Sequence, residues 1–309
     1  MTELTDEKAA QQRQAAIAGN PMQVVQVGLD DGYAYTKVAL PDGRLVSVPS
    51  RARIGAAGLS GRSLHMVTGL PVAAFYRGDG QQRRQAIQSK REGLKLTVEP
   101  VVAKKSSTRQ ALKASIAFHE VIPEALAAWY DFVIVTLDDG VTLDADRLNA
   151  PVAIVDIGGR TTDYVVVQDQ GVVHGSSGSL NRGMLDVKLR VANLIQERFD
   201  LNELGEQIIS RAVDTNRLRL HGKDYDVSDM VMNAKRELVE RLYAETRRKL
   251  GLGAELDRIL FVGGGSAALS SDIADWFPNQ TIADHAAFAN ARGMLKYLQF
   301  VCDDASKER

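Results

Sequence analysis

Apolar and polar positions alternate along two separate stretches of the chain, and both stretches predict paired β-strands. The first covers residues 22–48, where apolar runs are separated by Asp-Gly dipeptides at 31–32 and 42–43, a sequence typical of hairpin turns. The second covers residues 150–180, where three apolar runs follow one another across two turns. Because each stretch contains an aspartate-bearing loop near its start, we interpret the two as one structural unit used twice.

Elsewhere, apolar residues recur every three to four positions, which predicts helices. One helix is predicted over 183–199 and a longer one over 228–250, with Ser228 as its N-cap and Gly251 after its last turn. A third is predicted from about Pro123, because proline is favoured in the first turn of a helix. The predicted apolar faces are formed by Leu185, Leu189 and Leu194 in the first helix and by Val231, Ala234, Leu238 and Leu242 in the second.

The composition is that of a protein with a sizeable core and no strong charge. The 309 residues are 45% apolar, and this length is typical of about two domains. The net charge is −1, so no overall field directs the chain to nucleic acid or to an anionic membrane. No stretch approaches the roughly 20 apolar residues that span a bilayer. Residues 1–21 have no apolar segment typical of a secretory signal, and we interpret them as a mobile extension.

Two further features bear on location and contacts. The single cysteine, Cys302, excludes an internal disulfide or a cysteine-built zinc site and predicts a cytoplasmic protein. Residues 76–110 are strongly basic, and two interpretations stay open for them: a solvated face or loop, or a contact with a filament neighbour or partner. The basic residues are Arg77, Arg83, Arg84, Lys90, Arg91, Lys95, Lys104, Lys105 and Arg109.

The first candidate loop follows an apolar run. Asp30 and Asp31 place carboxylates at the tip of the predicted strand, and Gly32 permits a tight turn whose N–H groups point outward. Lys37, in the returning strand, can reach a phosphate as a point charge. Taken alone, the Asp-Asp-Gly sequence is more often an ordinary hairpin turn. The interpretation as a phosphate loop depends on the second loop.

In the second loop Asp156 ends a buried apolar strand, Gly158-Gly159 allow close approach of the backbone, and Thr161-Thr162 offer hydroxyl groups. Asp30 and Asp156 on facing domains would hold a hydrated Mg²⁺, which prefers oxygen ligands and keeps several waters. The N–H groups of the loops would surround the phosphates. For Asp163 two interpretations stay open: the carboxylate has a functional role, or it stabilises its own turn.

Two more segments complete the candidate site. Gly263, Gly264 and Gly265 lie between an apolar strand and a predicted helix, where a side-chain-free turn favours contact with a ligand over a merely flexible turn. Glu124 is a single acid in an otherwise apolar segment. Its negative charge would either interact favourably with the dipole of its helix or orient the water that attacks a γ-phosphate. Neither the P-loop spacing nor the GxGxxG fingerprint is present.

In this order, the segments resemble the superfamily of actin, sugar kinases and heat-shock chaperones, and most of all the ParM/StbA plasmid-segregation actins. The resemblance covers most of residues 22–300. It implies an actin-like (ribonuclease H-like) α/β fold with two related domains flanking a nucleotide cleft. The segments that carry it are 29–37 and 156–163 (phosphate loops), 68–72 and 122–130 (a strand end and a connecting helix), 261–265 (adenosine) and 290–294 (the last helix).

The resemblance also implies roles for single residues, with ATP or GTP and Mg²⁺ as cofactors. Glu124 and Asp156 would be catalytic, Glu124 acting on the attacking water, and Asp30 and Asp156 would position Mg²⁺ through water. The nucleotide would be bound by Asp30, Asp31, Gly32, Tyr33, Lys37, Gly158, Gly159, Arg160, Thr161, Gly183, Lys235, Arg236, Gly263, Gly264 and Gly265.

The chain departs from the family pattern at two loop positions. Tyr33 stands where the family has serine or threonine, which removes a small hydroxyl and would slow turnover or alter loop opening. Arg160 adds a cation near phosphate, which would stabilise the transition state or tighten nucleotide binding. The segment between the first loop and Glu124 is also shorter than expected for a ParM protein, so the small subdomain at about 45–110 is expected to be reduced. Because that subdomain shapes the longitudinal contacts of filaments, the filament geometry would differ.

The predicted domains are residues 22–150 and 151–309, the second with an inserted helical subdomain at about 195–255 and a last helix at about 288–300 that packs back on the first. The implied function is an ATPase that assembles head to tail into filaments for plasmid DNA segregation and disassembles on hydrolysis. An adaptor protein on centromere-like plasmid DNA would be its partner, with no direct nucleic-acid or membrane contact required. A monomeric small-molecule (sugar-type) kinase and a non-hydrolysing nucleotide-dependent scaffold stay open as alternatives.

Overall fold

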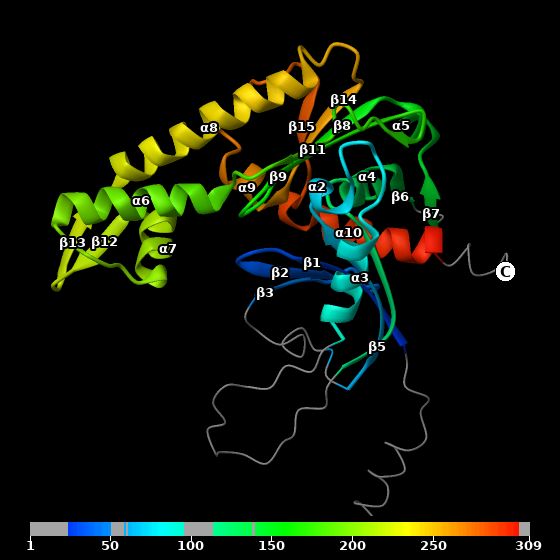
Figure 1. Cartoon of the computed structure of the whole chain (residues 1–309), viewed down its shortest axis with the longest axis horizontal. Coiled ribbons are helices and arrows are strands. Elements are labelled where there is room, and N and C mark those ends of the chain that lie inside the picture. The colour runs from blue at the N-terminus through cyan, green and yellow to red at the C-terminus, as the bar shows by residue number, and fades with distance from the viewer. Residues whose placement is uncertain (1–23, 51–58, 60, 96–113, 138–139, 303–309) are drawn as a thin grey trace, which may run out of the picture.

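The computed structural model describes residues 24–50, 59, 61–95, 114–137 and 140–302, and it is built around two mixed β-sheets (Figure 1). The predicted N-terminal extension lies outside the described residues. So do 51–58 and 96–110, which make up much of the predicted small subdomain and of the basic stretch. No helix in the described part of the chain is long and apolar enough to cross a membrane.

The first sheet has the strand order β3-β2-β1-β4-β5. Its first three strands form an antiparallel meander, and β4 and β5 add to the other side of β1 in parallel. The strands are β1 (Val24–Asp31), β2 (Tyr35–Ala39), β3 (Leu45–Pro49), β4 (Ser63–Leu70) and β5 (Ser115–Pro123).

The second sheet repeats this plan in the order β10-β9-β8-β14-β15, with β11 pairing β9. Again an antiparallel unit comes first, and two parallel strands add to the other side of its first strand. This shared topology confirms the duplicated unit predicted from the alternating pattern. The strands are β8 (Val152–Ile157), β9 (Thr162–Gln168), β10 (Gly171–Val172), β11 (Gly178–Leu180), β14 (Arg258–Val262) and β15 (Gln280–Ile282).

Two helices, α4 (Leu126–Val133) and α10 (Ala289–Tyr297), lie between the sheets and pack against each other (Figure 1). Glycines allow the close approach. A Cβ at Gly293 would stand 1.6 Å from the carbonyl oxygen of Ala127 on α4, and one at Gly28 would stand 1.9 Å from that of Ala291. The last helix is therefore wedged between β1 and α4, and it brings Asn290 into the space between the sheets.

An arm extends from the second sheet to one side (Figure 1). The four residues predicted to line the apolar stripe of its long helix are buried. Ser228 is the first helical residue and Val227 the N-cap, so the predicted cap was one residue late. In the shorter helix the predicted leucine face was wrong: Leu189 is 57% exposed, while Val187, Val191 and Ile195 are buried. The arm contains α6 (Met184–Phe199), α7 (Glu206–Thr215), β12 (Arg217–Leu220), β13 (Lys223–Asp226) and α8 (Ser228–Leu250).

Two predicted boundaries near the candidate loops were also wrong. Pro123 ends β5, where it pairs with Leu70, and the following helix begins at Leu126. The three glycines at 263–265 do not form a turn before a helix but are themselves its first turn. The remaining elements are α2 (Val72–Phe75), α3 (Arg84–Gly93), β6 (Ile134–Leu137), β7 (Gly140–Leu143), α5 (Ala145–Asn149), α9 (Gly263–Ala268) and the short turns η2 (Ala286–Phe288) and η3 (Leu298–Cys302).

Candidate functional site

The first loop carries a partly buried ion pair. Asp30 and Lys37 lie directly opposite each other on β1 and β2, so their side chains share one face of the sheet, with Nζ 3.0 Å from Oδ2. Burial opposes the charge of the amine, but the carboxylates of Asp30, Asp156 and Glu124 outweigh it and raise the pKa of Lys37. Lys37 therefore stays a cation that faces the acids of both sheets.

Asp156 holds the equivalent place in the second sheet. It lies near the end of β8 and is 5% exposed. Burial, and then the charges of Asp30 and Asp163, raise the pKa of Asp156 to about 7. The turn after it is closed by the N–H of Gly158, which donates to the carbonyl oxygen of Thr161 at 2.9 Å. The acid of the first loop is thus near enough to Asp156 for its charge to disfavour ionisation there.

Glu124 lies in the connection between β5 and α4. Its N–H donates to the carbonyl oxygen of Leu70 at 2.8 Å, and Ala125 then turns the chain with a φ of 62°. Burial raises the pKa of Glu124 well above its usual range, and the charges of Asp163, Asp30 and Asp156 add to that effect. The helix starts only at Leu126, so Glu124 precedes the first helical turn. This weakens the interpretation that the acid is there only to interact with the helix dipole.

Glycine at position 69 makes room for this acid. A Cβ there would stand 2.6 Å from Cγ of Glu124 and 2.6 Å from Cε of Met294 on α10. The glutamate side chain is therefore packed against β4 and the last helix, which limits the directions in which its carboxylate can point.

Asp163 is occupied by structural hydrogen bonds. Its Oδ2 accepts the hydroxyl of Thr161 at 2.9 Å, and its Oδ1 accepts the N–H of Val72 at 2.7 Å as well as the hydroxyl of Ser179. The carboxylate thus stabilises its own turn and the start of α2, which follows β4. This arrangement favours the structural interpretation of Asp163.

The three glycines of α9 have different surroundings. A Cβ at Gly263, whose φ is 87°, would stand 2.2 Å from Oδ1 of Asp156, and one at Gly265 would stand 2.4 Å from Cγ2 of Ile157. A Cβ at Gly264 would meet no described atom within 4 Å. The outer two glycines therefore permit packing on the second loop, and Gly264 alone presents its bare Cα to open space.

Gly183, the N-cap of α6, also packs on the second loop. A Cβ there would stand 2.7 Å from the carbonyl oxygens of both Gly158 and Gly159, and these oxygens accept the N–H groups of Met184 and Leu185. A Cβ at Gly159 would in turn stand 3.5 Å from Cβ of Tyr33, so the two loops are neighbours.

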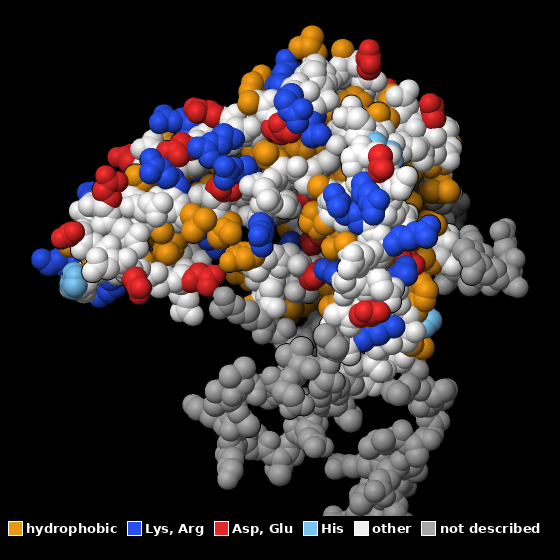
Figure 2. All heavy atoms as spheres, viewed as in Figure 1, with side chains coloured by type: hydrophobic (Ala, Val, Ile, Leu, Met, Phe, Trp, Pro, Cys, Tyr) orange, Lys and Arg blue, Asp and Glu red, His pale blue; other side chains and the backbone are white. Residues whose placement is uncertain are grey.

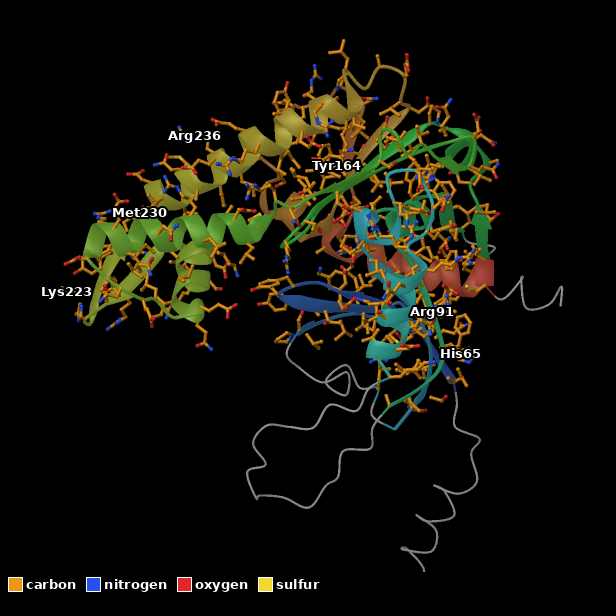
Figure 3. All side chains as sticks on the ribbon, viewed as in Figure 1. His65, Arg91, Tyr164, Lys223, Met230 and Arg236 are labelled. Carbon is orange, nitrogen blue, oxygen red and sulfur yellow. The ribbon has the colours of Figure 1, made fainter. Side chains whose placement is uncertain are left out.

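The other predicted nucleotide ligands differ in position. Tyr33 and Arg160 are exposed at the loops. Lys235 and Arg236 lie on α8, and the guanidinium of Arg236 donates to the side chain of Asn233, one turn earlier in the same helix. Figure 3 shows Arg236 on the outer side of α8, away from α6, and Figure 2 shows acidic and basic side chains mixed along this arm. The structure does not bring Arg236 to the three loops.

The acids of the two loops fit a hydrated cation. The charges of Asp30 and Asp156 disfavour ionisation of Glu124, and that of Asp30 disfavours ionisation of Asp156, so a divalent ion would relieve this repulsion. Within the described ranges, no three His, Cys, Asp or Glu side chains are grouped as direct ligands for a metal.

One buried residue at this site had been given no role from the sequence. Asn290 of α10 is 5% exposed and contacts both Asp156 and the backbone of Ala125. A buried asparagine needs polar partners, and its position in the quoted segment 290–294 was the available signal. The sequence could not name those partners, because they lie more than 130 residues away.

Comparisons with known proteins agree with this fold. The family model of the C-terminal region of archaeal MreB-like actin homologues matches residues 154–275. A 15-stranded ParM filament from Clostridium botulinum superposes with a TM-score of 0.68 at 16% identity, over 90% of this chain and 100% of that chain. The archaeal actin homologue Ta0583 in complex with ADP gives 0.65 at 20% identity, over 92% and 100%. A search of curated proteins found no match. The actin-like fold predicted from the sequence is confirmed, with ParM proteins among its structural relatives.

Proposed function

We propose that this chain, which has the fold of an actin-type protein, binds Mg·ATP between its two sheets, hydrolyses it, and assembles head to tail into filaments. The observation that carries the proposal is the convergence of Asp30 and Asp156, each near the end of the first strand of its sheet, on Lys37. Relatives of the same fold include a filament and a complex with ADP, which supports both halves of the proposal.

In this mechanism the magnesium ion, when bound, supplies charge neutralisation for the polyphosphate. Asp30 and Asp156 would hold its waters, and Lys37 would contribute a positive charge beside the phosphates. Loop N–H groups other than that of Gly158, which closes its own turn, would face the phosphates, and the adenosine would pack along Gly264. GTP would satisfy the same phosphate contacts, so a comparison of the two nucleotides belongs in the first binding measurements.

Glu124 serves as the group that orients the attacking water and accepts its proton. Burial raises the pKa of Glu124 in the ligand-free protein, and the charges of Asp163, Asp30 and Asp156 add to that effect. A magnesium ion near Asp30 and Asp156 would remove the part that comes from those two charges, and so would favour the ionised form that a base requires.

Assembly follows if the nucleotide fixes the angle between the two sheets. Contacts of a head-to-tail kind need not close into rings and so extend into filaments. We propose that hydrolysis weakens these contacts, that an adaptor on centromere-like plasmid DNA links the cytoplasmic filament to its cargo, and that the filament itself need not touch DNA. The net charge of −1 is consistent with recruitment through an adaptor.

The direct test is sedimentation of the purified chain with Mg·ATP, Mg·ADP and no nucleotide, combined with negative-stain microscopy. We expect a pellet of filaments with Mg·ATP and its loss as phosphate is released. No pellet over a wide range of protein concentrations would exclude assembly. Phosphorylated product from a panel of sugars would instead support the kinase alternative, and filaments without phosphate release would support the scaffold alternative.

A further inference from the structure

The side chain of Asp31 points away from the nucleotide side of the first sheet. Neighbouring residues of a strand face opposite sides, so Gly28 and Asp30 share one face of β1 while Leu29 and Asp31 share the other. The first face packs against α10, because a Cβ at Gly28 would touch the backbone of Ala291. The second face packs against the end of α3, through the contact of Leu29 and its neighbours with Leu94.

On that second face, Asp31 is held by a lysine from α3. Nζ of Lys90 lies 2.5 Å from Oδ2 of Asp31, although 59 residues separate them, and their side chains are only 19% and 30% exposed. Burial tends to raise the pKa of Asp31, and the charge of Lys90 opposes this. The other oxygen, Oδ1, is buried with no hydrogen-bond partner among the described residues. Lys90 is therefore the contact that keeps this carboxylate in place.

The helix that carries Lys90 is itself anchored at several points. Ile87 is buried with Phe75 and Val121, and the guanidinium of Arg91 forms an ion pair with Glu120 on β5. Figure 3 shows Arg91 on α3 beside this strand. A helix anchored in this way can hold its lysine in place, and through the lysine the carboxylate at the start of the first loop.

We propose that Lys90 is a positioning residue that sets the conformation of the first phosphate loop from behind, through Asp31. This inference rests on the proposed nucleotide site. With Lys90 in place, the carboxylate of Asp31 stays on the α3 face and the N–H groups of Gly32 and Tyr33 are presented to phosphate. Without it, the carboxylate is free to turn toward the phosphates, where its negative charge repels them. Part of the basic stretch at 76–110 thus acts inside the molecule.

A double-mutant cycle on Mg·ADP affinity tests this coupling, with a fluorescent ADP analogue as the probe. Lys90→Met should weaken binding about tenfold, and Lys90→Arg, which keeps the charge, should restore it to within about threefold of the natural protein. Asp31→Asn removes the charge that Lys90 controls. In the Asp31→Asn background, Lys90→Met should therefore have almost no further effect, whereas two independent contributions would multiply.

Lys188→Met is the matched control, because Lys188 is a half-buried lysine that binds Ser210 on the arm, and its loss should leave affinity unchanged. Unfolding midpoints in urea identify any variant that has lost its fold. If Lys90→Met does not fold, Lys90→Arg and Asp31→Asn still test the coupling. If the natural protein does not bind Mg·ADP or Mg·ATP, the proposed function is wrong. If it binds, but Lys90→Met has no effect or the same effect in both backgrounds, Lys90 does not position the loop through Asp31.

Discussion

Asn290 donates a hydrogen bond from Nδ2 to Oδ2 of Asp156 over 2.6 Å. The oxygen of the same amide accepts the N–H of Ala125 at 3.1 Å, so one side chain connects β8 to the turn that carries Glu124. The asparagine comes from α10, which also packs on β1 and α4. The last helix of the chain therefore fixes the distance between the two acids proposed to be catalytic, and this makes Asn290 a sensitive point of the site.

Replacing Asn290 by alanine should cost both stability and nucleotide affinity. The change leaves the buried N–H of Ala125 unpartnered and removes a hydrogen bond that lowers the pKa of Asp156, so we expect a loss of about 1–3 kcal/mol in the free energy of unfolding. Urea unfolding and calorimetric titration with Mg·ADP would measure the two effects. Asn193→Ala is the control, because Asn193 is exposed on α6. Equal stability of the two variants would show that the Asn290 bridge contributes little.

The duplicated sheet and the three loops were predictable because their signals are local. Alternation, Asp-Gly turns and apolar runs are read within about ten residues, and they placed Asp30, Asp156 and the glycines at strand ends. The partners of Asp156 were not predictable in the same way. Asn290 contacts it, and Asp30 acts on it by charge, only because of the way α10 and the two sheets pack together, and a single sequence contains no local sign of either interaction.

Helix boundaries and faces failed for a related reason. The leucine count favoured a face with Leu189, but the β-branched Val187, Val191 and Ile195 face the core. Proline at 123 is typical of a first helical turn, yet here it ends β5, and the backbone turns at Ala125 before the helix starts. In both cases tertiary packing overrode a preference that is weak on its own.

Glu124→Gln tests the catalytic assignment. Glutamine keeps the size of the side chain and its packing against Gly69 but cannot accept a proton. We expect Mg·ATP binding and assembly to be retained, and phosphate release to fall by about 10²–10⁴-fold. Single-turnover phosphate release measures this directly. Glu240→Gln, at an exposed position of α8, should behave like the natural protein. Unchanged release in Glu124→Gln would mean that another group activates the water.

The raised pKa of Asp156 predicts a pH dependence with a definite sign. An ordinary aspartate ionises near 3.8, whereas Asp156 in the ligand-free protein ionises at about 7. Between these values the folded protein retains a proton that the unfolded chain has released. The free energy of unfolding of the ligand-free protein should therefore fall as the pH rises toward 7, because the folded state must then ionise a buried carboxyl.

Urea unfolding at several pH values, with and without Mg·ADP, measures this dependence. Asp156→Asn should show a shallower fall, since its amide does not titrate, although Glu124 and Asp163 titrate in the same direction. Binding of Mg·ADP favours the ionised form, so affinity should rise with pH up to about 7 in the natural protein. A natural protein whose stability is flat over this range, or rises, would contradict the environment of Asp156 described above.

The glycines of α9 give a matched pair of substitutions in one turn of helix. Alanine at position 263 is forced into a φ of 87° with its Cβ 2.2 Å from Oδ1 of Asp156, and we expect it to destabilise the ligand-free protein by about 2 kcal/mol or more. A Cβ at 264 meets no described atom within 4 Å, so we expect Gly264→Ala and Gly264→Val to fold normally.

The two positions should also differ in the way they affect the ligand. If adenosine packs along Gly264, valine there weakens Mg·ADP binding without moving the unfolding midpoint of the ligand-free protein, and alanine has a smaller effect of the same sign. Fluorescence titration and urea unfolding on the same samples separate affinity from stability. Full affinity in Gly264→Val would place the adenosine elsewhere in the space between the sheets, while leaving the roles of Asp30 and Asp156 at the phosphates unaffected.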